Sequence, residues 1–404
     1  MSKYKSLFGL PEEVLYCNSC VISNQRPKST VEFKHISSDK KDTISFGQDG
    51  LCDACSYNKK KEENIDWVLR EKKLVELLDQ HRSKDHSYDV VVPGSGGKDS
   101  AYTSHVLKYK YGMNPLTVTW APHLYTDIGW KNFTNWSHIG GHDNILFTPN
   151  GRLHRYLTLQ AFNNLLHPFQ PFIVGQRIIG PSIAKKFGIK LVMYGENQAE
   201  YGNNSEENHQ PFMDKSFFSS IKPYDSCLGG VSIRDILNST NFTLSDFQPY
   251  IPTDLNSLNA SNINVYYLGY YIKWDPQECY YYAVENTGFE PNSERTPGTY
   301  SKYSSIDDKI DMFHYYTTLI KFGIGRATYD AAQEIRNQKI TREEGVYLVK
   351  KFDQEFPIKY FDDFLSYINI TQEQFWKTID RFRSPHLWKR DENDHWALRK
   401  PIWS

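Results

Sequence analysis

Residues 89–100, with the sequence DVVVPGSGGKDS, place a short apolar run directly before a glycine-rich loop and a lysine. A brief apolar run of this kind suits a strand that is buried in a parallel sheet. The residues that follow, KDSAYTSHVLKYKYG, predict a helix that Gly112 is well placed to end. The stretch therefore predicts a strand, a tight loop and a helix in that order, which is the first unit of an α/β fold.

The same alternation continues along the next hundred residues. Further strands are expected in PLTVTWA, NILFTPN and KLVMYGEN, and helices in WVLREKKLVELLDQHR and RLHRYLTLQAFNNLLH. The expected fold class is α/β, a doubly wound and mainly parallel sheet. Such sheets bind ligands at the carboxyl ends of their strands, near the switch point of the topology.

The 404 residues are enough for two or three domains, at roughly 150 residues each. We expect four parts. Residues 1–65 form a zinc-binding N-terminal segment, and residues 66–202 form a nucleotide-binding α/β domain. Residues 203–263 form an irregular insertion rich in Asn, Ser, Asp and Pro, and residues 264–404 complete the sheet and are then helical. In this last part VYYLGYYIKW predicts a strand over 265–274. Ser305 with Asp308, and Thr341 with Glu344, resemble helix capping boxes.

The glycine-rich loop differs from the two commonest phosphate-binding loops. Val92 stands where the Walker pattern has its first glycine, and Asp99 stands where that pattern has Ser or Thr. Asp99 also takes the place of the last glycine of a dinucleotide-binding fingerprint. The pattern that fits is S-G-G-x-D-S, the pyrophosphatase loop (PP-loop) of enzymes that cleave ATP between its α and β phosphates.

The residue types of this loop suit that chemistry. Gly96 and Gly97 let backbone N–H groups approach an anion closely, and the serines and the helix start add further donors. Lys98 supplies a cation, and Asp99 is expected to hold Mg²⁺ against the leaving pyrophosphate. The ATP-binding loop is thus predicted to comprise Ser95, Gly96, Gly97, Lys98, Asp99 and Ser100. ATP cleaved in this way adenylates an oxygen atom, so the loop indicates the activation step and leaves the acceptor open.

Four cysteines in the first 55 residues form two C-x-x-C pairs, Cys17 with Cys20 and Cys52 with Cys55. Each pair fits two corners of a tetrahedral zinc site. The 31 residues between the pairs exceed the common spacing of about 15–20. Structural zinc is the favoured interpretation, and a redox or persulfide role is the alternative.

The bulk composition limits the classes of partner. The formal net charge of −1 gives no global attraction for nucleic acid. No apolar run reaches the roughly 18 residues of a membrane span, and the N-terminal residues lack the pattern of a secretory signal. We therefore expect a cytoplasmic protein that binds no nucleic acid and has no membrane span.

Several segments together resemble the N-acetyl sugar amidotransferases of bacterial surface-glycan biosynthesis, a group of PP-loop ATP pyrophosphatases that make lipopolysaccharide O-antigen or pseudaminic-type sugars. The matching stretches include CNSCVISNQRP, GLCDACSY, PGSGGKDSAY, LTVTWAPHLYTDIGWKNFTNW, NGRLHR, HPFQPFIVGQ, YGENQAEYG and YSKYSSIDDKIDMFHYYTTLIKFGIGRATYDAAQEIRN. They extend over about residues 15–355. The resemblance implies a reaction in which ATP adenylates the oxygen of a sugar acetamido group and ammonia displaces AMP to give an acetamidino group.

The resemblance also implies cofactors and partners. ATP, Mg²⁺ and structural Zn²⁺ are the expected cofactors, and the expected substrate is a nucleotide-activated acetamido sugar. Ammonia would come from a separate glutaminase of the histidine-biosynthesis type, with a cyclase-like companion. The chain is consistent with this, because it has no cysteine at its second position or in an obvious glutaminase nucleophile turn.

Roles for individual residues follow from the resemblance by position. Adenine would be read near Val118, Thr119 and Trp120, and Gly195 would lie beside ATP. Catalytic candidates besides Lys98 and Asp99 are Glu196, Asp307 and Lys309, with Asp308 in the same charged cluster. The sugar pocket would be lined by His123, Tyr125, Trp130, Lys131, Arg152, His154 and Arg326. For each of these residues a purely structural role stays open: a helix cap or solvated carboxylate for the acids, packing for the aromatic residues and histidines, and a surface ion pair for Arg326.

Two other functions remain open. A tRNA-modifying enzyme of the thiolation or lysidine type shares the loop and a zinc knuckle, but thiolation needs a further reactive cysteine, for which Cys227 and Cys279 are the candidates. Such an enzyme would also carry a basic surface. A non-catalytic scaffold that binds nucleotide and glycan is the second alternative, and the intact loop argues against it.

Overall fold

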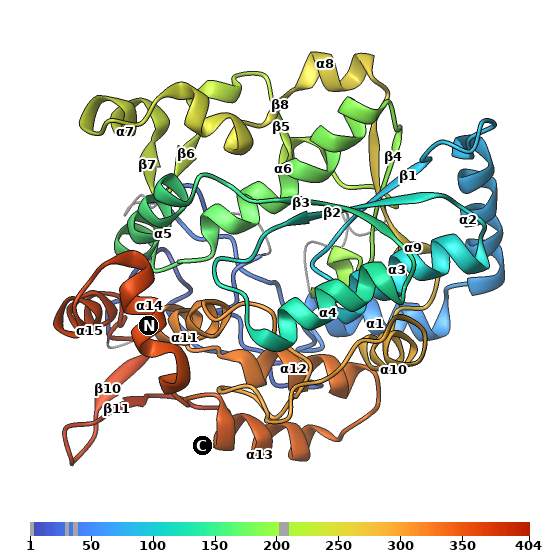
Figure 1. Ribbon diagram of the computed structural model, residues 1–404. Coiled ribbons are helices and arrows are strands. Elements are labelled where there is room, and N and C mark those ends of the chain that lie inside the picture. The colour runs from blue at the N-terminus through green and yellow to red at the C-terminus, as the bar shows by residue number, and fades with distance from the viewer. Residues whose placement is uncertain (1–3, 29–31, 35–38, 202–209) are drawn as a thin grey trace.

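The computed structural model describes residues 4–28, 32–34, 39–201 and 210–404 (Figure 1). Its centre is a five-stranded parallel sheet with the strand order β3-β2-β1-β4-β9. The strands are β1 (Val90–Pro93), β2 (Pro115–Trp120), β3 (Asp143–Phe147), β4 (Leu191–Tyr194) and β9 (Asn264–Tyr267). The predicted doubly wound, mainly parallel sheet is therefore confirmed.

Helices cover both faces of the sheet because successive strand residues point to opposite sides. Val90 and Val92 of β1 pack toward α2 (Trp67–His81), α3 (Lys98–His105) and α10 (Pro276–Thr287). Val91 points the other way, into the core formed with α5 (Gly151–Leu165) and α6 (Gln170–Phe187). A π-helical turn, Val106–Lys110, extends α3, and α4 (Asp127–His138) connects β2 to β3.

The predicted strand over 265–274 is too long. β9 ends at Tyr267 and the chain turns at once into α9 (Leu268–Tyr271). The backbone N–H of Gly269 donates to the carbonyl oxygen of Gly195 at 2.8 Å, which holds this turn against the carboxyl end of β4. Tertiary contact at the sheet edge thus overrides the local strand propensity of the tyrosine-rich stretch.

The segment predicted as an irregular insertion contains only short elements in its described part, residues 210–263. These elements are β5 (Ser219–Ser220), β6 (Cys227–Leu228), β7 (Val231–Ser232), α7 (Ile233–Ser239), β8 (Thr253–Asp254) and α8 (Leu255–Ala260), with 3₁₀ turns between them. Its apolar side chains, such as Leu228, Ile236 and Phe247, join the main core on the α5 and α6 side of the sheet. The insertion is therefore packed as part of the α/β unit.

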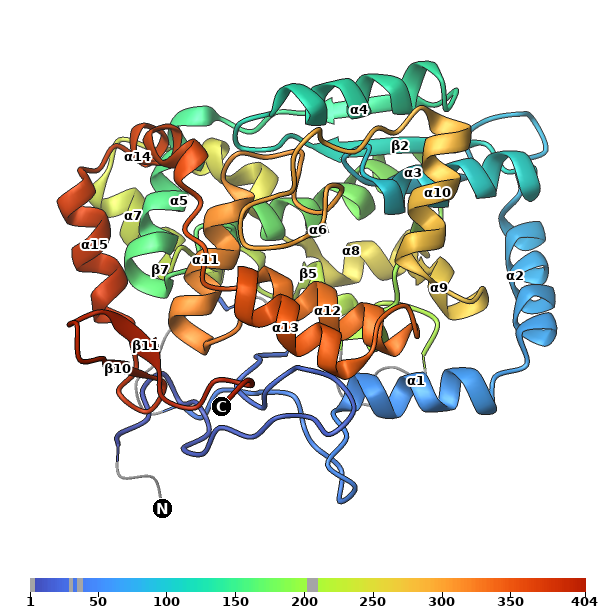
Figure 2. The same cartoon turned by 90° about the horizontal axis from the view of Figure 1, so that it is seen from below.

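The rest of the chain is mainly helical, as predicted. It consists of α11 (Asp311–Phe322), α12 (Arg326–Arg336), α13 (Arg342–Phe352), α14 (Phe361–Ile368), α15 (Gln372–Arg381) and a hairpin of β10 (Trp388–Arg390) and β11 (Trp396–Leu398). Figure 2 shows the N-terminal segment, which contains α1 (Asp53–Glu63), lying beside α12 and α13. Within the described ranges, no helix combines the length and the apolarity that crossing a membrane requires.

One predicted capping box is confirmed and the other is wrong. Thr341 and Glu344 cap α13 reciprocally through side chain and backbone. Ser305 and Asp308 do not start a helix, because α11 begins only at Asp311. The carboxylate of Asp308 instead accepts a hydrogen bond from the backbone N–H of His123 at 2.7 Å, so a long-range partner competes with the local cap.

Candidate active site

The glycine-rich loop joins the carboxyl end of β1 to the first turn of α3. Gly96 has a φ of +82°, and a Cβ there would lie 2.8 Å from Cα of Phe133, so only glycine fits the turn. Gly97 is the N-cap of α3, and Ser100 Oγ donates to its carbonyl oxygen at 3.0 Å. The loop therefore presents its backbone and the positive end of a helix at the carboxyl edge of the sheet.

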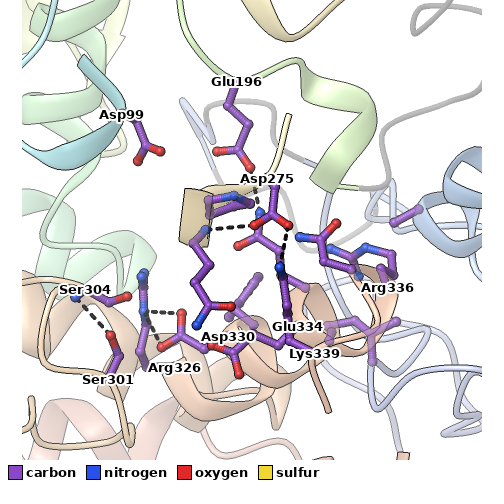
Figure 3. Close-up of a pocket in the computed structure, with 18 of the residues that line it drawn as sticks. Asp99, Glu196, Asp275, Ser301, Ser304, Arg326, Asp330, Glu334, Arg336 and Lys339 are labelled. Atoms are coloured by element: carbon purple, nitrogen blue, oxygen red, sulfur yellow. Dashed lines mark hydrogen bonds and ion pairs between the residues drawn. The ribbon is translucent and has the colours of Figure 1, made fainter. Parts of the chain in front are cut away.

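A cavity opens beside this loop, and Lys98 and Asp99 line it (Figure 3). Glu196, which follows β4, lies with Asp99 on one side, and α12 supplies Arg326 and Asp330 on the other. Helix α10, the segment 301–304 and the N-terminal segment complete the wall. The site thus combines residues that are far apart in the sequence, as expected where strand ends meet.

Lys98, Asp99 and Glu196 form a compact electrostatic group. Lys98 Nζ donates to Asp99 Oδ2 at 2.6 Å, and Gln333 Nε2 donates to Glu196 Oε1 at 2.8 Å. Burial and the neighbouring Asp99 carboxylate raise the pKa of Glu196 to about 8, although Lys98 acts in the opposite direction. Burial alone would lower the pKa of Lys98, but Asp99 and Glu196 raise it above its usual value. At neutral pH, Glu196 therefore carries its proton and Lys98 is charged.

Asp99 meets the requirement for a magnesium ligand. Its second oxygen, Oδ1, is buried and has no hydrogen-bond partner among the residues that the structure describes. A buried carboxylate oxygen without a partner is costly unless a cation or donor joins it. Carboxylate oxygens are the ligands that Mg²⁺ prefers, usually together with waters and phosphate oxygens.

A recess adjoins the cavity at the loop and shares Lys98, Asp99 and Arg326 with it. Ser95, Gly96, Gly97 and Asp307 also line it. Burial raises the pKa of Asp307, while a hydrogen bond with the Ser95 side chain opposes that shift. The structure therefore brings Asp307 to the loop, as the sequence suggested.

Arg326 stands where the cavity and the recess meet. Its Nε pairs with Asp330 Oδ1 at 3.1 Å, and its guanidinium lies 4.4 Å from the ring centre of Tyr315. Burial opposes its charge, yet Asp330 and Tyr315 keep its pKa above the usual value. Asp311, one turn before Tyr315, is partly buried nearby, and burial raises its pKa to about 7 in spite of Arg326. A fixed cation is thereby held within reach of anything bound at the loop.

Sequence reasoning missed several lining residues. Tyr303 and Ser304 line both the cavity and the recess, and Asp330, Gln333 and Arg26 line the cavity. All except Arg26 lie within the stretch 300–337 that carried the family resemblance, but nothing in its pattern of residues distinguished a lining side chain from a packed one. Arg26 lies in CNSCVISNQRP, another of the matching stretches, but nothing there distinguished it as a lining residue.

Lys309 lines neither the cavity nor the recess. Its Nζ pairs with Asp363 Oδ1 of α14 at 3.0 Å, and its backbone N–H donates to the carbonyl oxygen of Leu124. Its neighbour Asp308 is buried and bonds His123 Nδ1 at 2.7 Å, besides the backbone N–H groups of His123 and Leu124. Asp308 thus ties the segment after β2 to the start of α11.

The residues predicted to bind adenine lie at the end of β2, and Gly195, predicted to lie beside ATP, follows β4. Val118, Thr119 and Trp120 are buried in or at the end of β2, where the carbonyl oxygen of Val118 accepts from the N–H of Gly94. Gly195 precedes Glu196, and a Cβ on it would lie 2.6 Å from Trp274.

Of the predicted sugar residues, His123 and His154 are buried and stacked at 4.7 Å between ring centres. Tyr125 contacts Trp130, which is half exposed; Lys131 pairs with Glu290 at 2.7 Å; and Arg152 is exposed at the start of α5. Of this set only Arg326 lines the cavity beside the loop.

The four N-terminal cysteines come together as predicted. The sulfur atoms of Cys17, Cys20, Cys52 and Cys55 all lie within 4.8 Å of one another and all four residues are buried. Cys20 Sγ and Cys52 Sγ are 3.8 Å apart. Tetrahedral zinc with Zn–S bonds of about 2.3 Å requires about the same sulfur separation, so the cluster fits that ion.

The cysteine cluster is part of the cavity wall. Cys52 and Ala54 line the cavity together with Ile22, Arg26 and Ile44 of the same segment. Arg342 of α13 donates to the carbonyl oxygens of Cys20 and Cys17, at 3.3 and 3.4 Å, which fixes the cluster on the C-terminal helices. A metal held here would therefore support the floor of the cavity.

Comparisons with known proteins bear on the C-terminal region above all. Residues 297–401, about a quarter of the chain, match the family described as LPS biosynthesis protein WbpG-like, C-terminal domain. The matched region supplies Tyr303, Ser304, Asp307 and Arg326 to the cavity and recess. No curated protein matches the chain.

Two solved structures show weak similarity. One is the NH3-dependent NAD synthetase of Campylobacter jejuni, at 17% identity and a TM-score of 0.26, over 35% of this chain and 59% of that chain. The other is the NMN synthetase of Francisella tularensis, at 12% identity and a TM-score of 0.28, over 71% of this chain and 97% of that chain. At these TM-scores the likeness supports no argument about function, and the family match remains the informative comparison: the C-terminal region of this chain is similar to that of WbpG-like LPS biosynthesis proteins.

Proposed function

We propose that the protein is an ATP-dependent amidotransferase that converts an acetamido group of a nucleotide-activated bacterial surface-glycan sugar into an acetamidino group. The amide oxygen attacks the α-phosphorus of ATP and pyrophosphate leaves. Ammonia then attacks the carbon of the adenylated amide, and AMP leaves with the former amide oxygen. The products are the amidine, AMP and pyrophosphate.

The observation that carries this proposal is the loop with Lys98 and Asp99 at the head of a cavity that also contains Glu196 and Arg326. The S-G-G-x-D-S loop favours cleavage of ATP between the α and β phosphates rather than transfer of the γ-phosphate. The match of residues 297–401 to a family named for LPS biosynthesis favours a surface-glycan sugar as acceptor.

Each charged group has a role in this reaction. The backbone of Ser95 to Asp99 would cradle the pyrophosphate, and Asp99 Oδ1 would hold Mg²⁺, which neutralises the leaving group when bound. Arg326 would stabilise negative charge that develops on the phosphates. Glu196, protonated at neutral pH, would donate a hydrogen bond at the reacting amide without repelling ATP. Asp307, beside Ser95, would help to orient the loop.

The remaining predicted roles are parts of the same proposal. Zinc at the cysteine cluster would be structural, and ammonia would be supplied by a separate glutaminase with a cyclase-like companion in the cytoplasm. Tyr125, Trp130, Lys131 and the more distant His123, His154 and Arg152 would act on the sugar side. Lys309, given its pairing with Asp363, would position α14 rather than touch ATP.

A thiolating tRNA-modifying enzyme is less well supported. Cys279 lies near the loop, but burial and the Asp99 carboxylate raise its pKa well above the usual value. Nucleophilic sulfur requires the thiolate, so this thiol is poorly suited to carry sulfur. Cys227 lies in β6, within the insertion.

The test is release of AMP from ATP, measured with ammonium and a panel of nucleotide-linked diacetamido sugars. We expect sugar-dependent AMP and a product about one mass unit lighter, because NH replaces O. Asp99→Asn should lower the rate by roughly 100-fold to 1,000-fold, since it removes the proposed metal ligand. The control is Asp362→Asn, an exposed position in α14. Absence of sugar-dependent AMP with every acceptor would refute the proposal.

A further inference from the structure

A second and larger cavity, of about 670 Å³, lies at the same carboxyl edge of the sheet. It is lined by the N-terminal segment, the end of α5, helices α6 and α11, and the ends of β4 and β9. Three residues, Arg26, Tyr315 and Tyr329, line both this cavity and the one beside the ATP loop. Molecules bound in the two cavities would therefore be neighbours, separated by these three shared residues.

The size of this second cavity suits a whole ligand. Its volume lies within the roughly 300–1,000 Å³ that small-molecule sites occupy, whereas the cavity beside the loop measures about 140 Å³. The volume of the smaller cavity lies below that range.

The charge of the second cavity favours an anion. Among the residues that the structure describes, seven Lys and Arg residues line it against three Asp and Glu residues, in a chain whose net charge is −1. Lys321 Nζ and Lys41 Nζ share one carboxylate, that of Glu32, each at 2.8 Å. Burial and the nearby Lys41 lower the pKa of Lys321 to about 8 in spite of Glu32. An additional anion would relieve this excess of positive charge.

A buried polar atom in the same cavity also lacks a partner. Nδ1 of His314 forms no hydrogen bond within the part of the chain that the structure describes, and it is buried. Burial, with His167 next, lowers the pKa of His314, so the ring is neutral. Its ring is fixed by stacking on His167, at 4.8 Å between centres, and on Phe169, at 5.4 Å. A fixed neutral imidazole with a free nitrogen is suited to a ligand hydroxyl or phosphate oxygen.

We infer that the second cavity binds the nucleoside diphosphate end of the acceptor, with its lysines and arginines on the diphosphate and Tyr194 available to stack on the base. The sugar would then extend past Arg26 and Tyr315 toward the ATP loop. This inference rests on the proposed function, because it identifies the acceptor of that reaction as a sugar linked through a diphosphate.

Calorimetric titration of the full chain with UDP, with CMP and with a nonhydrolysable ATP analogue tests this assignment. Arg177 and His314 line the second cavity only, so Arg177→Gln and His314→Phe should each weaken UDP binding about tenfold. The affinity for the ATP analogue should stay unchanged. Lys186→Gln, on the exposed side of α6, is the charge-matched control and should bind UDP as the unmodified protein does.

Thermal unfolding checks that each variant is folded. If one variant does not fold, amide hydrogen exchange on the unmodified protein replaces it, and UDP should slow exchange in α6 and α11. Three results would each overturn the assignment. They are unchanged UDP affinity in both variants, tighter binding of CMP than of UDP by the unmodified protein, and variants that lose affinity for the ATP analogue rather than for UDP. Binding needs no turnover, so UDP binding without AMP release would refute the proposed reaction and leave the second site standing.

Discussion

Replacing Glu196 with Gln tests the electrostatics of the candidate site directly. In the folded protein, burial and the Asp99 carboxylate raise the pKa of Glu196 from 4.5 to about 8. Between these two pH values the folded protein keeps a proton that the unfolded chain has already released. The stability that Glu196 contributes is therefore fully present below pH 4.5 and is lost as the pH rises through about 8.

The size of the effect follows from the same shift. Each pH unit of the window corresponds to about 1.4 kcal/mol, so a window of about 3.5 units sets an upper limit near 5 kcal/mol. Glu196 is only partly buried, and water that reaches the ionised carboxylate reduces the expected value to about 2–3 kcal/mol. Glutamine stays neutral at every pH and keeps an oxygen that can accept from Gln333.

We therefore expect Glu196→Gln to match the unmodified protein near pH 5 and to be more stable at pH 9. For a chain of this length, about 1 kcal/mol corresponds to about 1 °C in Tm, so the gain at pH 9 is about 2–3 °C. Differential scanning calorimetry without nucleotide at pH 5, 7 and 9 measures it. Glu63→Gln, an exposed position at the end of α1, controls for the loss of one negative charge. A Tm difference that is the same at pH 5 and pH 9 would show that Glu196 is not a protonated buried acid.

Three further predictions concern the four-cysteine cluster, Arg326 and Lys309. Metal analysis of freshly purified protein should give about one zinc per chain, and Cys20→Ser should lower both the zinc content and Tm; a full zinc content in that variant would contradict a four-cysteine site. Arg326→Lys should lower the rate of AMP release roughly tenfold to 100-fold with Tm little changed, because lysine cannot reproduce the planar contact with Asp330 and Tyr315. An unchanged rate would show that Arg326 has no role in the reaction. Lys309→Met should change the rate of AMP release less than threefold and shift Tm by roughly 1 °C, because the ion pair of Lys309 with Asp363 is partly exposed. A loss of activity as large as that of Asp99→Asn would instead indicate that Lys309 is catalytic.

The parts of the fold that the sequence predicted are those with short-range causes. The strand at 90–93, the turn at Gly96 and the helix from Lys98 follow from an apolar run, a positive φ and a helix-compatible stretch that lie next to one another. The two C-x-x-C pairs predicted a four-sulfur cluster because each pair already forms half of it. The predicted capping box of α13 is confirmed because its two residues, Thr341 and Glu344, lie only three positions apart.

The contacts that local spacing did not reveal involve partners far away in the sequence. Asp308 has the spacing of a helix cap, yet His123, 185 residues away, takes its carboxylate. Lys309 is next to two acidic residues in the chain but pairs with Asp363. Local spacing cannot reveal which of two competing partners is nearer after folding.

By itself, then, the amino-acid sequence determined the α/β class, the geometry of the glycine-rich loop and the cysteine cluster, because the interactions involved span a few residues or one strand–loop–helix unit. Only the tertiary structure decided that the cysteine segment forms the floor of the cavity, that the partly buried Glu196 lies near Asp99, and that a second cationic cavity adjoins the first. Burial and charge proximity are properties of the packed chain. They set the pKa of Glu196 and the excess charge around Lys321, and no local pattern encodes them.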